Sequence, residues 1–131
     1  MWGSGITRRR RHGALVEMVQ VAERTGSYRA PWEDTPHLWE LYTGVDDVLR
    51  ALQHDWRTAL AGAIYVAIEV GNGDLQQDIA TAFAKLQRTH GGIRQILEAN
   101  ADHPAIASAM RKERALLSGF TGLLAGPSQA A

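Results

Sequence analysis

The chain has 131 residues, 45% of them hydrophobic, and its 14 basic side chains balance its 14 acidic ones. This length supports one domain with a modest core rather than two domains. A neutral chain has no overall field to draw it onto nucleic acid or an anionic membrane, so either role needs a local cluster. Cysteine is absent, which excludes disulfides and thiolate metal sites and fits a reducing, cytoplasmic compartment.

The N-terminal 13 residues form a basic arm. Four consecutive arginines stand beside His12, with no acidic residue before Glu17: Arg8, Arg9, Arg10 and Arg11. We predict that residues 1–13 are disordered by themselves. The arginines either form a solvated tail or contact phosphate groups, nucleic acid or an acidic partner. The residues that follow are too polar for a signal peptide. Arginine makes up most of the basic residues, which is typical of a GC-rich bacterial genome.

Residues 14–25 are expected to form a short helix. Leu15, Met18 and Ala22 share one face of it. A helix of this length is marginal in isolation, so its apolar face must dock on the rest of the chain or on another protein. Gly26 suits the C′ position that ends a helix.

The longest pattern in the sequence predicts a helix over residues 35–71. Apolar residues recur there at alternating spacings of four and three: Leu38, Tyr42, Val45, Leu49, Leu52, Trp56, Ala59, Ala63, Val66 and Val70. Such an unbroken heptad pattern indicates one long amphipathic helix. Pro36, directly after Thr35, suits the first helical turn.

The remaining segments complete an all-α fold. Gly71-Asn72-Gly73 predicts a tight turn, and Asp74 with Gln77 has the spacing of a capping box that opens a second helix over residues 74–99. A third helix is expected over 103–120, followed by a flexible tail at 122–131. We therefore predict an antiparallel helical bundle over 14–121, with three principal helices plus a short N-terminal helix.

A first candidate site lies beside His90, which two glycines follow in the second helix. Folding the hairpin about its turn brings His90 near His54 and Trp56, with Tyr42 towards the open end. Each glycine costs about 1 kcal/mol relative to alanine inside a helix. The glycines seat the ring of Trp56, kink the chain between two helical pieces, or open a small-ligand pocket between these side chains.

A second candidate site lies at the open end of the hairpin. His37 and Glu40 are three residues apart, and the same register brings them near Asp102 and His103. Two imidazoles and two carboxylates suit a divalent transition metal. The spacing is the reverse of the acid-x-x-His motif of di-iron bundles and occurs once. The alternative is that these residues cap helices.

The apolar pattern itself predicts an interaction surface. At 1.5 Å per residue it is about 50 Å long, and the third helix covers about half of it. The uncovered part, which includes Leu49 and Leu52, would bind a protein partner or a second copy in an antiparallel dimer. No nucleophile–base pair is visible. We therefore expect a protein-interaction module with an adaptor or regulatory role and no catalysis. The alternative is a helical bundle that binds a metal or a small ligand and could act as an enzyme.

A further interpretation rests on two Tyr-x-x-x-Asp/Glu patterns, at Tyr42–Asp46 and Tyr65–Glu69. Together with two long paired helices, they loosely resemble the helical-hairpin proteins of type VII secretion systems. Both patterns, however, lie within the first long helix rather than after the hairpin, and Gly71-Asn72-Gly73 replaces the Trp-x-Gly turn of that family. The apolar stretch before this turn is too short to cross a bilayer, so we expect no membrane insertion.

Overall fold

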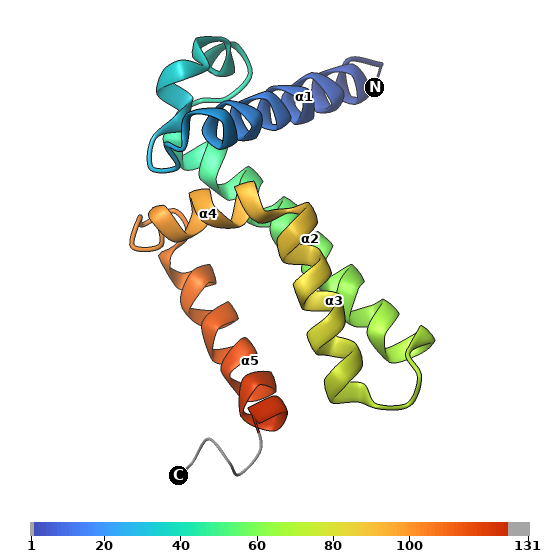
Figure 1. Ribbon diagram of the computed structural model, residues 1–131. Helices are drawn as coiled ribbons and strands as arrows, with labels where there is room; N and C mark the ends of the chain where they lie inside the picture. Colours follow the sequence, from blue (N-terminus) through green and yellow to red (C-terminus); the bar gives the residue numbers. More distant parts are fainter. Residues whose placement is uncertain (1, 126–131) are drawn as a thin grey trace.

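The computed structural model describes residues 2–125, with side chains from 5 to 119, and all of the regular structure in this range is helical (Figure 1). In chain order the elements are α1 (Trp2–Thr25), the 3-10 helices η1 (Pro31–Asp34) and η2 (Pro36–Glu40), α2 (Val45–Val70), α3 (Leu75–Thr89), α4 (Gly91–Ala99) and α5 (Ala107–Ala125). The predicted all-α fold is confirmed.

The helices divide the molecule into two regions. In the first, α1 lies across α4 and the two 3-10 helices, near the start of α2. In the second, the antiparallel hairpin of α2 and α3 extends away from α1, and α5 leaves the end of α4, runs beside the hairpin and contacts α3 (Figure 1). Because α4 crosses from the end of α3 to the start of α5, these two helices are separated at the junction and come closer together away from α1 (Figure 1).

The hydrophobic core lies at the junction. Each surrounding element contributes a side chain with no exposed surface: Met18 from α1, Leu38 from η2, Leu49, Leu52 and Trp56 from α2, and Ile96 from α4. Burial of such side chains supplies most of the stabilisation in a domain of this size. The core therefore sits at one end of the hairpin, and the other end has little covering it.

The predicted boundary at Ala14 is corrected, since α1 begins at Trp2 and includes most of the residues expected to be a disordered arm. Arg11 is held at the junction: its backbone carbonyl accepts a hydrogen bond of 3.0 Å from the Tyr42 hydroxyl, and its guanidinium pairs with Asp47 at 3.3 Å. Arginine is also a good helix former. The helix ends as expected, because Gly26 has φ +73° and its amide donates to the carbonyl of Ala22.

The start of the long helix is also corrected, from residue 35 to Val45. The segment before it folds as η1 and η2, whose hydrogen bonds join residues three apart, and Leu38 and Tyr42 reach the core from this segment. Asp47, in the first turn of α2, accepts a hydrogen bond from the amide of Thr43 and so ties the preceding segment to the start of the helix. The heptad pattern identified buried positions correctly there but not the backbone that carries them.

The tight hairpin is confirmed, but the second helix is divided. α2 ends at Val70 and α3 begins at Leu75, where Asp74 caps it by accepting from the amide of Gln77 at 3.1 Å. His90 then ends α3 and begins α4, so the predicted helix 74–99 is two helices. The break redirects the chain across α1 (Figure 1).

The last helix begins and ends later than predicted, at Ala107 and Ala125 rather than at 103 and 120. Turns occupy residues 100–106, where the ring nitrogen of His103 accepts from the amide of Ala105 at 3.1 Å. Residues 122–125 of the predicted tail are helical, and residues 126–131 lie outside the described part of the chain.

Candidate interaction surface

The last two turns of α2 are apolar on nearly every side. Tyr65, Val66, Ile68 and Val70 are each more than half exposed, and Glu69 is the only charged residue among them. Helices that are apolar all round are normally buried. Leu75, at the start of α3, is also about half exposed and extends the apolar surface across the turn. We call these five apolar residues the hairpin tip.

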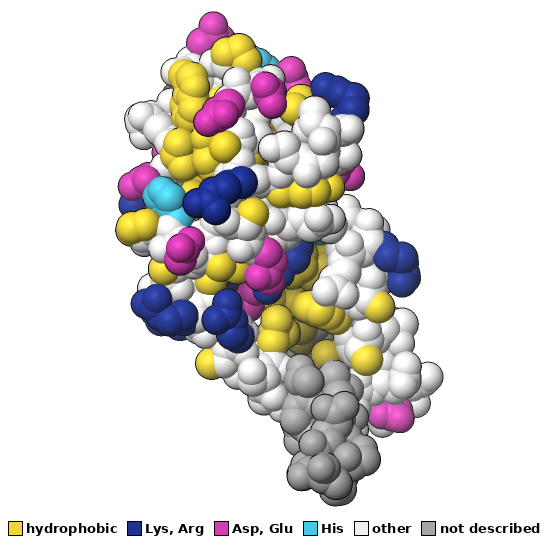
Figure 2. All heavy atoms as spheres, turned by 60° about the vertical axis from the view of Figure 1, so that its left-hand side comes forward, with side chains coloured by type: hydrophobic (Ala, Val, Ile, Leu, Met, Phe, Trp, Pro, Cys, Tyr) yellow, Lys and Arg dark blue, Asp and Glu magenta, His cyan; other side chains and the backbone are white. Residues whose placement is uncertain are grey.

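A groove runs beside the hairpin tip, between the hairpin and α5. The hollow has a volume of about 290 Å³ and is lined by side chains of three helices: Leu60, Ala63 and Ile64 from α2, Ile79 and Phe83 from α3, and Leu117 from α5. The lining residues include no charged side chain. Figure 2 shows hydrophobic side chains at the bottom of the hollow beside α5. An apolar, uncharged hollow of this kind suits the side chains of another helix.

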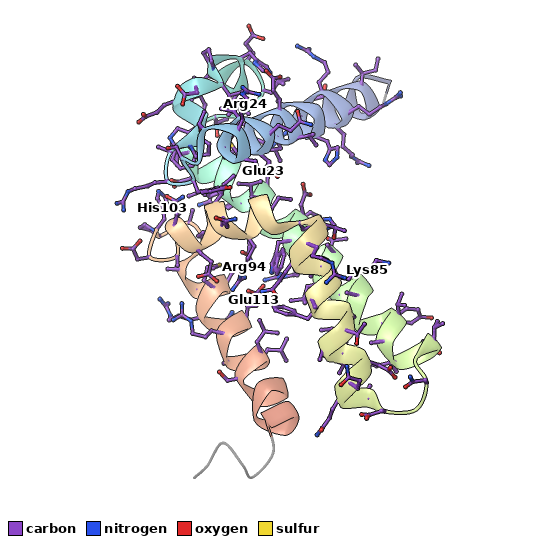
Figure 3. The ribbon with its side chains drawn as sticks, in the orientation of Figure 1. Glu23, Arg24, Lys85, Arg94, His103 and Glu113 are labelled. Atoms are coloured by element: carbon purple, nitrogen blue, oxygen red, sulfur yellow. The ribbon has the colours of Figure 1, made fainter. Side chains whose placement is uncertain are left out.

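A buried polar network lies beside the groove, behind Phe83, which packs against Trp56. The indole of Trp56 donates to a carboxylate oxygen of Glu113 at 2.6 Å, and the guanidinium of Arg94 donates to the other oxygen. Arg94 also pairs with Glu98 at 2.5 Å and lies 5.1 Å above the Trp56 ring. Arg94 and Glu113 point into the angle between α4 and α5 (Figure 3). The network therefore joins α2, α4 and α5 at the junction.

Sequence reasoning missed Glu113, although the sequence contains a signal for it. Ile106, Met110, Glu113 and Leu117 have the spacing of one helical face, so Glu113 is an acid at a core position. It is 7% exposed. A buried carboxylate needs a partner, and an arginine with a tryptophan N–H satisfies both of its oxygens.

The residues of the predicted metal site are not brought together. His37 lies 3.1 Å from Glu17, and His103 lies 3.5 Å from Asp46, so the two imidazoles have different carboxylate neighbours. Among the described residues, no three or more His, Asp or Glu side chains are grouped as metal ligands would be. The register that placed Glu40 and Asp102 beside these histidines assumed one continuous helix from residue 35, which the 3-10 segment replaces.

The residues of the predicted ligand pocket are also dispersed. Trp56 has no exposed surface and packs edge-to-face against Phe83 at 6.5 Å. His54 and Tyr42 line a hollow between α1 and α2, whereas His90 lines another between α1 and the junction of α3 and α4. The division of the second helix at His90 turns its side chain towards α1 instead of Trp56.

The second glycine after His90 has a packing role that differs from the predicted one. A Cβ atom at Gly92 would lie 2.7 Å from Val19 and 2.8 Å from the carboxylate of Glu23. Both of these side chains belong to α1, and Glu23 is seen beside α4 in Figure 3. Gly92 therefore allows α1 to approach α4 closely and does not seat Trp56.

The predicted interaction residues have different surroundings. Leu49 and Leu52 are completely buried in the junction, because α1 and η2 cover the half of α2 that was expected to be free. They are therefore unavailable to a partner in this fold. Of the arginines, Arg8, Arg9 and Arg10 are exposed on α1, and Arg11 is half-buried against α2.

Comparison with known proteins gives no relative: no protein-family model, curated protein sequence or solved structure matches the chain. Of the two tyrosine patterns, Tyr42 is buried before α2 begins, and Tyr65 is exposed near the end of α2. None of the helices in residues 2–125 combines the length and the apolar character that a membrane crossing requires.

Proposed function

We propose that the protein is a helical interaction module that works by self-association through the hairpin tip and the groove. The observation that carries this proposal is the exposure of Tyr65, Val66, Ile68 and Val70 on two consecutive helical turns. Apolar side chains scattered singly on a surface are ordinary, but a contiguous apolar patch marks an interaction site.

The partner is a second copy because one chain supplies both halves of a contact. The hairpin tip is an exposed apolar helix end, and the neighbouring groove is an apolar hollow with no charged lining residue. In the first region, side chains of α1 bury those of α2 in the core, whereas the side chains of the hairpin tip are exposed. In a two-fold dimer the hairpin of each copy would fill the place that is open in the other.

Sedimentation velocity across 1–200 µM tests the proposal. We expect the wild-type chain to move from monomer to dimer in this range, and Val66→Glu with Ile68→Glu to stay monomeric with an unchanged circular dichroism spectrum. Both replaced side chains are more than half exposed, so the charges have little effect on the monomer fold.

Val16→Glu on α1 is the matched control, because Val16 is also an exposed aliphatic residue but lies in the first region. It should dimerise like the wild type. A wild-type chain that stays monomeric at 200 µM would remove the second copy as the partner and leave an apolar helix of another protein as the alternative.

A further inference from the structure

A second surface, far from the hairpin tip, lies between α1 and the first turns of α2. It is a hollow of about 1040 Å³ with six basic side chains in its lining: Arg8, Arg9, Arg11 and His12 from α1, and Arg50 and His54 from α2. Two carboxylates, of Asp47 and Asp55, also line it. Four guanidinium groups against two carboxylates make the hollow positive, and we call it the arginine groove.

Ion pairs within the protein neutralise only part of the positive charge of the arginine groove. Arg11 pairs with Asp47 at 3.3 Å, and His12 lies 3.8 Å from Asp55. Arg50 lies 3.9 Å from Asp46 in a pair whose side chains are about 60% exposed. Exposed pairs of this kind contribute little, so Arg50 can exchange Asp46 for another anion at small cost.

Two arginines of the groove carry positive charge that no ion pair with a described side chain neutralises. Arg8 and Arg9 are exposed, and neither makes an ion pair with a carboxylate among the described side chains. Outside the four consecutive arginines the chain has ten basic and fourteen acidic side chains, so the positive charge is concentrated in this one place although the whole chain is neutral. A local positive field of this kind attracts polyanions.

We propose that the arginine groove binds the phosphate backbone of a nucleic acid. Arginine presents a planar fork that matches two oxygens of a phosphate group. Arginines on two neighbouring helices, Arg8 and Arg9 on α1 and Arg50 on α2, can contact successive phosphates of one strand that lies in the groove.

A membrane surface fits these residues less well. A helix that binds lipid headgroups also buries an apolar face in the bilayer. On α1 that face, with Leu15 and Met18, is packed into the core of the protein itself. Tyr42, the one aromatic residue of the groove, is 5% exposed and donates its hydroxyl to the backbone of Arg11. Tyr42 is therefore unavailable to stack on a base, and because contacts to phosphate carry no sequence information, binding should be independent of sequence.

Fluorescence anisotropy with a labelled 20-nucleotide single strand of mixed sequence tests the proposal on the full chain. We expect micromolar binding at 50 mM salt, with the logarithm of the association constant falling with a slope of about −2 against the logarithm of salt concentration, as expected for three phosphate contacts. Arg8→Gln with Arg9→Gln should weaken binding by about tenfold or more and bring the slope to about −0.7.

Arg111→Gln with Arg114→Gln is the matched control, since both residues are exposed on α5 and the change in net charge is the same. It should bind like the wild type. The proposal is overturned if the two double variants bind equally, if binding survives 500 mM salt, or if anionic vesicles or poly-glutamate bind as tightly as the nucleic acid. None of the four positions belongs to the hairpin tip, so this result is independent of the dimerisation test.

Discussion

The two halves of α2 belong to one apolar pattern but have opposite surroundings. In the first half, Leu49, Leu52 and Trp56 have no exposed surface, because α1, η2 and α4 surround them. In the second half, Val66 and Val70 continue the same spacing and are 54% and 75% exposed. A heptad pattern therefore identifies the face that a helix can bury, and the other elements of the chain decide how much of it is buried.

Single alanine substitutions at corresponding positions of the two halves of α2 should differ most strongly in their effect on stability. We expect Leu52→Ala to lower the free energy of unfolding by about 2–5 kcal/mol, because it leaves a cavity in a closed core. Val66→Ala should change it by less than about 0.5 kcal/mol, since the side chain already contacts water. Urea denaturation at low micromolar concentration, where the proposed dimer is expected to dissociate, measures both. Similar losses would show that the end of α2 is packed in the monomer.

The next largest loss of stability is expected from the buried network of Trp56, Arg94 and Glu113. Glu113→Ala removes the acceptor of the Trp56 indole and the buried partner of Arg94, and should cost about 1.5–3 kcal/mol. The indole N–H resonance of Trp56 should shift in the same variant. Because Glu113, together with the buried side chain of Met110, ties α5 to the junction, the amides of α5 should also exchange with solvent faster.

Glu98→Ala is the control for this change, because Glu98 also pairs with Arg94 but its side chain is 49% exposed. It should cost about 0.2–1 kcal/mol and leave the Trp56 resonance in place. If it costs as much as Glu113→Ala, the charge of Arg94 rather than the buried contact with Trp56 determines the stability of the junction.

Part of this fold could be predicted from the sequence because the signals are local. Gly26 and Gly73 both adopt positive φ at turns that the sequence marked, and Asp74 caps α3 as its spacing with Gln77 indicated. Each of these signals acts within a few residues along the chain. Element types and turns of this kind depend on local chemistry.

The rest depends on contacts between distant residues. Arg11, which the sequence places in a disordered arm, is held in α1 by Tyr42 and Asp47, more than 30 residues away along the chain. The candidate metal and ligand sites were placed by one hairpin register, and this register failed where 3-10 helices replace the start of the long helix and where His90 divides the second one. Near the turn itself, where no break intervenes, Ala63 and Ala80 do line the same hollow.

A smaller effect is expected at the contact between α1 and α4, where Gly92→Ala is the test and Gly62→Ala in α2 is the control. Gly92→Ala should destabilise the fold by about 1–3 kcal/mol, because the added methyl group would meet Val19 and Glu23. Gly62→Ala, in the exposed middle of α2, meets nothing within 4 Å and should stabilise the fold by up to about 1 kcal/mol. Thermal denaturation measures both, and opposite signs are the expected result. Stabilisation by both would mean that α1 lies farther from α4.

The smallest expected effect concerns the contact that fixes the N-terminal half of α1. Tyr42→Phe keeps the ring beneath the Arg11 guanidinium, 4.4 Å from its centre, and removes only the hydrogen bond to the Arg11 carbonyl. It should cost about 0.5–1.5 kcal/mol. Amide hydrogen exchange should become faster at residues 8–12 and stay unchanged in α3, because α3 shares no contact with this tyrosine.

The pH dependence of stability, compared between the wild type and Tyr42→Phe, isolates the effect of the Tyr42 hydroxyl group. Burial raises the pKa of Tyr42 above its ordinary value of 10.0, and the nearby charge of Arg11 opposes this only in part. The folded state therefore holds the phenolic proton more tightly than the unfolded state does, so the contribution of Tyr42 to stability is constant below pH 10 and falls as the pH rises above it. Urea denaturation at pH 8 and pH 10.5 should show a smaller alkaline loss for Tyr42→Phe than for the wild type. Equal losses would mean that the Tyr42 hydroxyl is exposed to water, and that α1 is anchored at Arg11 by the Asp47 ion pair instead.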